Sequence, residues 1–378
     1  MAGKVFFYVQ HLLGIGHLYR ASRIATALQD AGFAVDLVMG GVPIPGFEVA
    51  GAKVIQLPAI AAGPSGFADL VDERGEPVDA EFKTQRSAQL LAAFANSAPD
   101  IVLIEAFPFG RRQMRFELVP LLERIAAQGV ARPVVACSVR DILQENRKPG
   151  RNEETVEMLN KYFDLVLVHG DPAMVTLADT FPPAAEIATQ IVYTGLVAPA
   201  APAAASLERF DIVVSAGGGV VGKGIMQAAL AMARDLPRDS SMLVLTGPNL
   251  PADDAASLRR LVPEHVTLRR FVPDLPAILS NCRLSISQAG YNTVADILVA
   301  GCPSVLIPFA AGGETEQGHR ARILEGAGRA VVLAERDLSA QSLAKAARQA
   351  ADLPVGQMNF NLKGARNTAI ELQKRLSR

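Results

Sequence analysis

The chain has 378 residues, of which half are hydrophobic and one fifth are charged, enough for two ordinary domains with sizeable cores. Its 37 basic and 38 acidic residues leave a formal net charge of −1, so it lacks the basic excess that a nucleic-acid partner usually needs. Three cysteines, Cys137, Cys282 and Cys302, are odd in number and far apart. They fit neither a disulfide framework nor a zinc site, which favours a reducing compartment.

The N-terminal residues lead straight into an apolar run and lack the hydrophobic region and cleavage site of a signal peptide. No uninterrupted apolar stretch reaches about 18 residues, the length that a membrane span needs. We therefore expect a cytoplasmic protein.

The first half alternates short apolar runs with amphipathic helical patterns, which predicts a parallel, doubly wound sheet. The expected strands are Val5–Val9, Ala34–Met39, Lys53–Leu57, Ile101–Ile104, Val134–Ser138, Leu165–Val168 and Ile191–Tyr193. The expected helices between them include Tyr19–Ala31, Thr84–Ala95 and Glu117–Gln128.

A linker of alanine, proline and serine only, residues 198–206, separates this half from a second α/β series. The strands expected there are Ile212–Ser215, Leu243–Thr246, Thr267–Arg270, Leu284–Ser287, Ser304–Ile307 and Ala330–Leu333. We therefore predict two Rossmann-like domains, 1–197 and 207–361, and a last helix within 362–378. Ligands of open α/β sheets bind at the carboxyl ends of the strands, so a cleft between the domains is the expected site.

Chemistry-bearing residues begin at the first loop, residues 11–20. Gly14 and Gly16 let the backbone turn tightly and approach a ligand, and His17 follows at the start of the first helix. A helix N-terminus disfavours imidazolium, and a neutral histidine is what a general base must be. The alternative is a histidine that caps the helix or bonds a loop; His11 fits a structural role better.

Two further sites follow strands of the first half. Glu105 stands directly after an apolar run, where by position alone it is a surface residue or is paired to Arg111 or Arg112. Arg140 and Asp141 close the strand ending at Ser138 and are candidate acceptor-binding residues or an internal ion pair.

Segment Phe107–Val119 mixes arginines with apolar residues, as a surface that docks on anionic lipid does. The alternative is a row of solvated arginines beside a core stripe. In either case we expect Arg111, Arg112 and Arg115 to be solvated.

In the second half, residues 215–222 hold Gly217, Gly218 and Gly219, whose backbone N–H groups can form an anion nest. The loop is not a Walker A loop, and its Gly-x-Gly-x-x-Gly pattern lacks the acid of a dinucleotide site. Phe271 and Val272 lie at another strand end, where a core phenylalanine is the alternative to a ligand contact.

The most informative stretch is residues 287–296, followed by residues 314–317. A small-residue turn at Ala289 and Gly290 precedes a helix expected to begin near Asn292, which places free N–H groups where an anion can sit. Further polar residues follow on this helix and about twenty residues later. Phosphate at the turn, ribose at an acid and sugar hydroxyls at an acid-amide pair suit a nucleotide sugar. The residues concerned are Gln288, Thr293, Asp296, Glu316 and Gln317.

This stretch resembles the donor-binding signature of inverting two-Rossmann (GT-B) glycosyltransferases, namely family 28 with the bacterial peptidoglycan lipid-linked N-acetylglucosaminyltransferases, and the UDP-dependent plant and bacterial enzymes. The resemblance implies that Asp296 binds ribose and that Glu316 and Gln317 hold hydroxyls of the donor sugar. Gln288 stands where many members have a phosphate-binding histidine or arginine, and Arg320 where many have asparagine. Both departures leave the donor's identity open.

The resemblance extends to the rest of the chain. It implies that the 217–219 loop binds the donor diphosphate and that backbone at Val272 reads the nucleobase with Phe271 nearby. It also implies that His17 is the general base or touches the acceptor. Resemblance to the UDP-dependent branch implies that Glu105 orients His17, whereas the peptidoglycan transferase branch lacks this acid. It also implies a terminal helix that crosses back onto the first domain.

The sequence therefore predicts an inverting glycosyltransferase that uses a nucleotide-diphosphate sugar, UDP-linked by resemblance, and an acceptor hydroxyl on a lipid or glycan. No Asp-x-Asp motif lies at the expected cleft, so we predict no metal and no cofactor besides the nucleotide-sugar co-substrate. Two alternatives stay open: a sugar-nucleotide epimerase on the same architecture, and a non-catalytic sugar-nucleotide binding protein. If the acceptor is lipid-linked, the enzyme is peripheral at the inner face of the plasma membrane.

Overall fold

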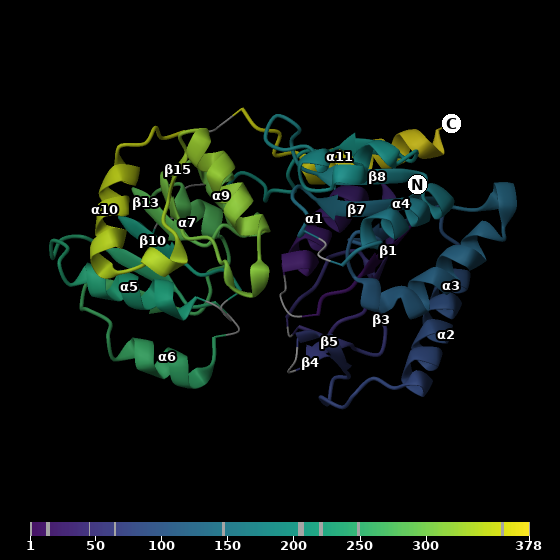
Figure 1. Ribbon diagram of the computed structural model, residues 1–378, viewed down its shortest axis with the longest axis horizontal. Helices are drawn as coiled ribbons and strands as arrows, with labels where there is room; N and C mark the ends of the chain where they lie inside the picture. Colours follow the sequence, from purple (N-terminus) through teal and green to yellow (C-terminus); the bar gives the residue numbers. More distant parts are fainter. Residues whose placement is uncertain are drawn as a thin grey trace. The chain divides into compact units, whose positions relative to one another are not determined.

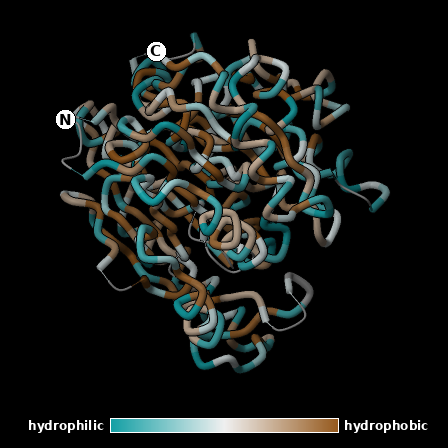
Figure 2. The backbone as a smooth tube through the Cα atoms, turned by 90° about the vertical axis from the view of Figure 1, so that its left-hand side faces the viewer, coloured by the Kyte–Doolittle hydropathy of each residue, from teal (hydrophilic) through white to brown (hydrophobic). Residues whose placement is uncertain are grey.

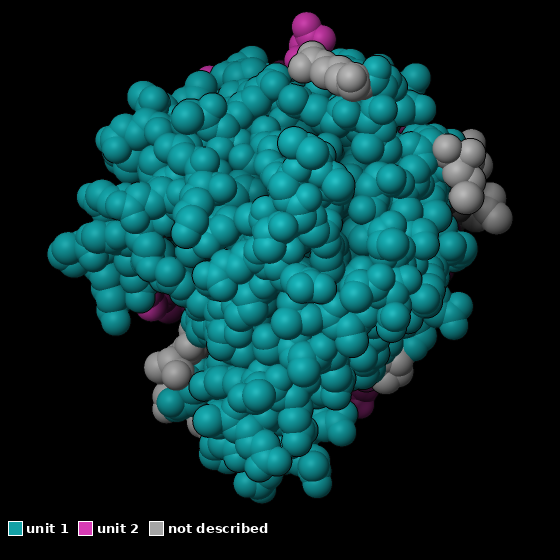
Figure 3. Space-filling view, turned by 90° about the vertical axis from the view of Figure 1, so that its right-hand side faces the viewer, with its two compact units in different colours: residues 1–197, 361–378 teal, residues 198–360 magenta. Residues whose placement is uncertain are grey.

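The computed structural model describes residues 2–12, 16–44, 46–63, 66–145, 148–202, 208–218, 222–247, 250–356 and 359–377. The chain divides into two compact units (Figures 1 and 3). Unit 1 is Met1–Val197 together with Asn361–Arg378, and unit 2 is Ala198–Phe360. Each unit is an α/β domain built on its own parallel sheet, which confirms the predicted fold class.

Unit 1 contains a seven-stranded parallel sheet in the order β3-β2-β1-β6-β7-β8-β9. The order reverses beside β1, as in a doubly wound sheet. Its strands are β1 Gly3–Val9, β2 Phe33–Met39, β3 Lys53–Gln56, β6 Ile101–Glu105, β7 Val134–Arg140, β8 Leu165–His169 and β9 Gln190–Tyr193. An antiparallel pair, β4 Ala61–Gly63 and β5 Gly66–Val71, stands apart from this sheet.

Unit 2 contains a six-stranded parallel sheet in the order β12-β11-β10-β13-β14-β15. Its strands are β10 Ile212–Ser215, β11 Met242–Leu245, β12 Val266–Arg269, β13 Leu284–Ser287, β14 Ser304–Leu306 and β15 Ala330–Val332. The strands of the parallel sheets in both units agree with the predicted ones to within two residues at either end.

Helices connect the strands of each unit. In unit 1 they are α1 Gly16–Asp30, α2 Ala80–Ser97, α3 Arg115–Ala126, α4 Arg151–Tyr162 and α11 Gly364–Leu376. In unit 2 they are α5 Lys223–Ala233, α6 Ala252–Arg259, α7 Leu275–Leu279, α8 Tyr291–Ala300, α9 Glu316–Gly326 and α10 Ala340–Ala351.

The terminal helix α11 belongs to unit 1, where it packs against α1 (Figure 1). Its first residue, Gly364, approaches the backbone of Gly195 and Leu196 so closely that a Cβ atom would lie 2.3 Å from the Gly195 carbonyl oxygen. Only glycine permits this approach, which seats the start of α11 beside the chain that leaves β9.

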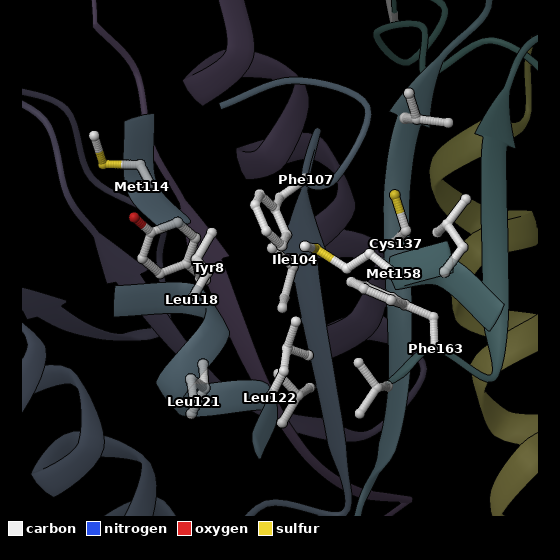
Figure 4. Close-up of a cluster of buried hydrophobic side chains, with 14 of the residues drawn as sticks. Tyr8, Ile104, Phe107, Met114, Leu118, Leu121, Leu122, Cys137, Met158 and Phe163 are labelled. Atoms are coloured by element: carbon white, nitrogen blue, oxygen red, sulfur yellow. The ribbon is translucent and has the colours of Figure 1, made fainter. Parts of the chain in front are cut away.

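Each unit has its own hydrophobic core, formed by its strands and the inner faces of its helices; hydropathy along the backbone is drawn in Figure 2. In unit 1, Phe107 and Ile104 lie in one cluster with Leu118, Cys137 and Met158 (Figure 4). All five are less than a tenth exposed. Strands buried on both faces explain why their sequences are continuous apolar runs.

A buried charged network also lies in unit 1. Arg86 of α2 donates to both carboxylate oxygens of Glu117 on α3, at 2.7 and 3.0 Å, and the hydroxyl of Tyr8 donates to the same carboxylate. Arg86 also donates to the carbonyl oxygens of Gly40 (2.9 Å) and Pro58. The guanidinium therefore ties two helices to the loops that follow β2 and β3.

Candidate active site

His17 is the second residue of α1, and its ring lies against the end of the neighbouring strand β6. Its Nδ1 is 2.8 Å from Oε1 of Glu105, the last residue of β6. The side chain of His17 is 21% exposed and that of Glu105 is 1% exposed. Arg20, one turn along α1, donates from Nη2 to the same oxygen of Glu105.

The tautomer of His17 follows from these contacts. Nη2 of Arg20 lies 3.2 Å from Nδ1, but Nδ1 cannot accept from Arg20 and donate to Glu105 at once. An ionised carboxylate is an acceptor only, and a lone pair on Nδ1 facing it at 2.8 Å would be repelled. The proton therefore resides on Nδ1, donated to Glu105, and Nε2 carries the lone pair that a general base needs.

The charge state of His17 follows from its surroundings. Burial, with help from the charges of Arg111 and Arg20 and against the opposing effect of Glu105, lowers the pKa of His17 to about 3. The ring is therefore neutral near pH 7. Burial alone would raise the pKa of Glu105, but the neighbouring positive charges outweigh it and hold that pKa below its ordinary value. With His17 neutral, Arg20 is the counter-charge that touches Glu105.

Another histidine, fully buried, lies at the same edge of the sheet and was missed by the sequence analysis. His169 ends β8, is fully buried, and has its Nε2 2.7 Å from the Ser138 hydroxyl and its Nδ1 2.8 Å from the Thr194 hydroxyl. Burial and the charge of Arg20 together lower its pKa to about 3. The signal that the sequence offered was a histidine at the end of an apolar run, residues 165–169.

The predicted acceptor-side residues lie near this edge. β7 continues to Arg140, two residues beyond its predicted end, so Arg140 is half-buried within the strand and pairs in register with His169. Asp141 is 1% exposed and packs on Gly170, where a Cβ atom would lie 2.8 Å from that of Asp141. Gly16 begins α1, and Gly14 lies outside the described residues.

The arginines of segment Phe107–Val119 were expected to be solvated, and the structure corrects this. Arg112 and Arg115 both pair with Glu154 of α4, and Nε of Arg111 donates to the carbonyl oxygen of Gln10 at 2.7 Å. The apolar side chains of the segment pack into the core of unit 1. Glu154, in the first turn of α4, therefore receives the charges of Arg112 and Arg115.

In unit 2, residues from two strand ends meet where a donor site was predicted. Gly217, after β10, has φ of +65°. A Cβ atom there would lie 3.7 Å from Oε1 of Gln288 and 3.9 Å from Oγ1 of Thr293. Gly218 has open space in the same position, and Gly219 lies outside the described residues.

The N-terminus of α8 provides the backbone donors of this site. Gly290 is its N-cap and has no side chain that could cap the helix, and the N-terminus of a helix is a favourable place for an anion. Asn292 and Thr293 lie in the first turn, and the half-buried Asp296 follows on the next. The helix begins at Tyr291, one residue before the predicted start.

The turn before α8 is held from α9. Oε1 of Gln317 accepts from the backbone N–H groups of Ala289 and Phe309, each at 3.2 Å. Arg320 is fully buried and donates to the carbonyl oxygen of Ala289 at 3.0 Å and to Oε1 of Glu316 at 2.8 Å. Glu316 and Gln317, predicted to hold sugar hydroxyls, thus also have protein partners. Arg320, noted only as a departure, is the centre of this arrangement.

Phe271 and Val272 lie after β12 and differ in burial. Phe271 is 59% exposed and Val272 is 5% exposed. The core interpretation of Phe271 is therefore wrong, and its ring is available for a stacking contact.

The described residues contain no group of three or more histidine, cysteine, aspartate or glutamate side chains that could hold a metal ion. Within the same part of the chain, no helix has both the length and the apolarity to cross a bilayer.

Comparison with known proteins agrees with this geometry. The family model of the glycosyltransferase family 28 C-terminal domain matches residues 212–365, which confirms the resemblance in unit 2. A curated relative, the UDP-N-acetylglucosamine--N-acetylmuramyl-(pentapeptide) pyrophosphoryl-undecaprenol N-acetylglucosamine transferase of Anaeromyxobacter sp. (strain K), is 39% identical over 87 residues. That alignment spans 23% of this chain and 23% of the relative's own length.

Solved structures match over the whole chain at low identity. The calicheamicin glycosyltransferase CalG4 has a TM-score of 0.62 at 16% identity and covers 100% of this chain and 95% of its own. Acinetobacter baumannii MurG has a TM-score of 0.59 at 16% identity, with 98% and 99% covered. At such identities the likeness shows the fold, which is the two-domain GT-B fold of glycosyltransferases.

Proposed function

We propose that this chain, whose residues 212–365 belong to the glycosyltransferase family 28 C-terminal domain, is an inverting glycosyltransferase. It moves a sugar from a nucleotide-diphosphate sugar, UDP-linked by analogy with its relatives, to an acceptor hydroxyl. The observation that carries this proposal is the His17–Glu105 pair, because it supplies the oriented, neutral base that such a transfer needs.

Inversion at the anomeric carbon takes place by one direct displacement. Nε2 of His17 takes the proton of the acceptor hydroxyl as that oxygen attacks the sugar. Glu105 holds the ring through Nδ1 and stabilises the imidazolium that forms. A pKa of about 3 makes the imidazole a weak base in the free protein. Negative charge on a bound substrate raises this pKa toward the working range.

The donor is held in unit 2. The turn at Gly217 and Gly218 and the uncapped N-terminus of α8 neutralise the diphosphate as it leaves, by dipoles and without a metal. Gln288 provides an uncharged contact to it. Asp296 binds the ribose, and Phe271 with Val272 lines the base.

The donor sugar meets α9. Gln317 and Glu316 recognise its hydroxyls, while Oε1 of each keeps its protein partner. This explains how two residues can both fix the turn before α8 and select a sugar.

The acceptor is lipid-linked or a glycan, because the curated relative named above acts on an undecaprenol-linked substrate. Arg140, Asp141 and Gly16 stand on the acceptor side. A lipid acceptor places the enzyme at the inner face of the plasma membrane. Segment Phe107–Val119 contributes mainly charge to such a contact, since its apolar side chains lie in the core or pack half-buried against it.

A donor screen followed by a transfer assay tests the proposal. Sugar nucleotides that bind the folded protein raise its melting temperature, and those that do are then supplied radiolabelled with a lipid extract or soluble glycans. Label in the acceptor together with free nucleoside diphosphate supports transfer. Label that stays on the nucleotide, as the same sugar or as its epimer, contradicts it.

A further inference from the structure

Arg20 is a buried arginine whose described contacts include both members of the proposed catalytic pair. It lies one turn after His17 on α1 and is 2% exposed. Its Nη2 donates to Oε1 of Glu105, the oxygen that also accepts from Nδ1 of His17. Burying a guanidinium costs several kcal/mol unless it is paired. The buried Arg20 therefore favours the ionised form of Glu105, the carboxylate to which it donates.

The charges of these three side chains decide the state of the base. A buried carboxylate 2.8 Å from an imidazole favours imidazolium when it is the only charge present. Nε2 would then already hold a proton and could not accept another. With Arg20 on the same oxygen, the trio is neutral overall when the ring of His17 is uncharged. Protonating the ring would create an uncompensated buried charge.

We propose that Arg20 is a positioning residue: its guanidinium neutralises Glu105 and thereby keeps His17 uncharged, with Nε2 ready to accept the acceptor's proton. The inference rests on the proposed role of His17 as the base. It assigns Glu105 to orientation and Arg20 to setting the charge state.

The other groups that act on His17 come from the elements packed around it. Arg111, in the loop after β6, lowers the pKa of His17 in the same direction as Arg20. His169, at the end of β8, is neutral itself because burial and Arg20 lower its pKa. Glu105 alone among these groups raises the pKa of His17. Removing Arg20 takes away one of the charges that oppose Glu105, so the pKa of His17 should rise.

Histidine ring shifts in an NMR titration of the full chain test the inference without any substrate. His17 should stay neutral to the lowest pH at which the wild type is folded. In Arg20→Met its pKa should rise by about 1–3 units, the size of shift that one neighbouring charge at contact distance produces, because a like charge beside the imidazolium is removed. Arg20→Lys should keep most of the wild-type behaviour. Arg23→Met, on the same helix with its guanidinium on the Val197 carbonyl oxygen, is the matched control.

A titration of Arg20→Met that matches Arg23→Met overturns the inference. If Arg20→Met does not fold, Arg20→Met/Glu105→Gln decides: a folded double variant shows that Arg20 serves to neutralise Glu105, and an unfolded one shows that it does not. In the transfer assay, Arg20→Met should move the acidic limb of kcat/KM to higher pH with KM for the donor unchanged. Failure of transfer in the wild type counts against the proposed function and leaves the NMR result standing.

Discussion

At the scale of single residues, His17 determines the predicted chemistry. His17→Ala removes the base but leaves the donor site of unit 2 untouched. Transfer should fall by about two to four powers of ten, the usual span for a general base, with unchanged donor affinity. Steady-state kinetics and donor calorimetry measure the two effects. His265→Ala, whose ring bonds the Ala233 carbonyl oxygen in unit 2, is the control, and near-normal turnover of His17→Ala would sink the assignment.

Asp296 offers a test of the nucleotide end of the donor. If it binds the ribose, Asp296→Ala loses a charge-assisted hydrogen bond worth roughly 1.5–3 kcal/mol, which is about a ten- to hundredfold weaker affinity for UDP. Calorimetry with UDP alone isolates this contact from the sugar. Equal affinities of the variant and the wild type for UDP would place the ribose elsewhere.

At the scale of elements, α9 holds the turn before α8 through two side chains. Gln317 accepts from the backbone N–H of Ala289, and Arg320 donates to the carbonyl oxygen of the same residue. Arg320→Met leaves the Ala289 carbonyl oxygen without the guanidinium and Glu316 without its buried partner. We expect a loss of stability of about 3–5 kcal/mol, as for other broken buried pairs, and weaker donor binding. Arg320→Met/Glu316→Gln should recover stability but not donor affinity. A double variant no more stable than Arg320→Met contradicts this prediction.

The pair between α2 and α3 is a second such test. Glu117→Gln leaves Arg86 buried without its carboxylate partner. The free energy of unfolding of unit 1 should fall by about 3–5 kcal/mol, which denaturant unfolding measures as a lower midpoint concentration. Replacing both partners with leucine and methionine should be much less damaging. If the single and the double variant are equally unstable, the network acts through packing and not through charge.

The sequence predicted the elements of this fold well because strands buried on both faces have one unmistakable pattern. It missed the β4–β5 hairpin, where β4 is only three residues long, and it missed His169. It paired Glu105 with His17 only through a family resemblance. Residues such as Arg20 and Arg320 could not be assigned, because a buried arginine and a solvated one are identical in sequence and differ only in which carboxylate the fold brings to them.

At the scale of the whole molecule, the buried histidines make unit 1 sensitive to acid. The folded pKa values of His17 and His169 are lowered from 6.5 to about 3. Between these values the unfolded chain binds protons that the folded chain does not, so stability falls as pH falls through this window. The lowered pKa of Glu105 acts in the same direction below its ordinary value.

Each such histidine should therefore contribute about 2 kcal/mol of destabilisation between about pH 6.5 and 5. Urea unfolding at several pH values, followed by tyrosine fluorescence, measures this slope, since Tyr8, Tyr19, Tyr162 and Tyr193 all lie in unit 1. His169→Asn should flatten the slope by one histidine's share, whatever its effect at neutral pH. A slope equal to that of the wild type would show that the pKa of His169 is the same in the folded and the unfolded chain.

The return of the chain to unit 1 at Asn361 has a consequence for synthesis on the ribosome. Unit 2 is continuous in sequence, whereas unit 1 is completed by α11 from beyond Asn361. A domain forms once its whole sequence has emerged. Unit 2 can therefore finish folding while α1 still exposes the apolar surface that awaits α11, and the first unit to be translated is the last to be complete. A chain that stops at Phe360 and is arrested on the ribosome through an added linker long enough to span the exit tunnel should present a native-like unit 2 and a protease-sensitive unit 1.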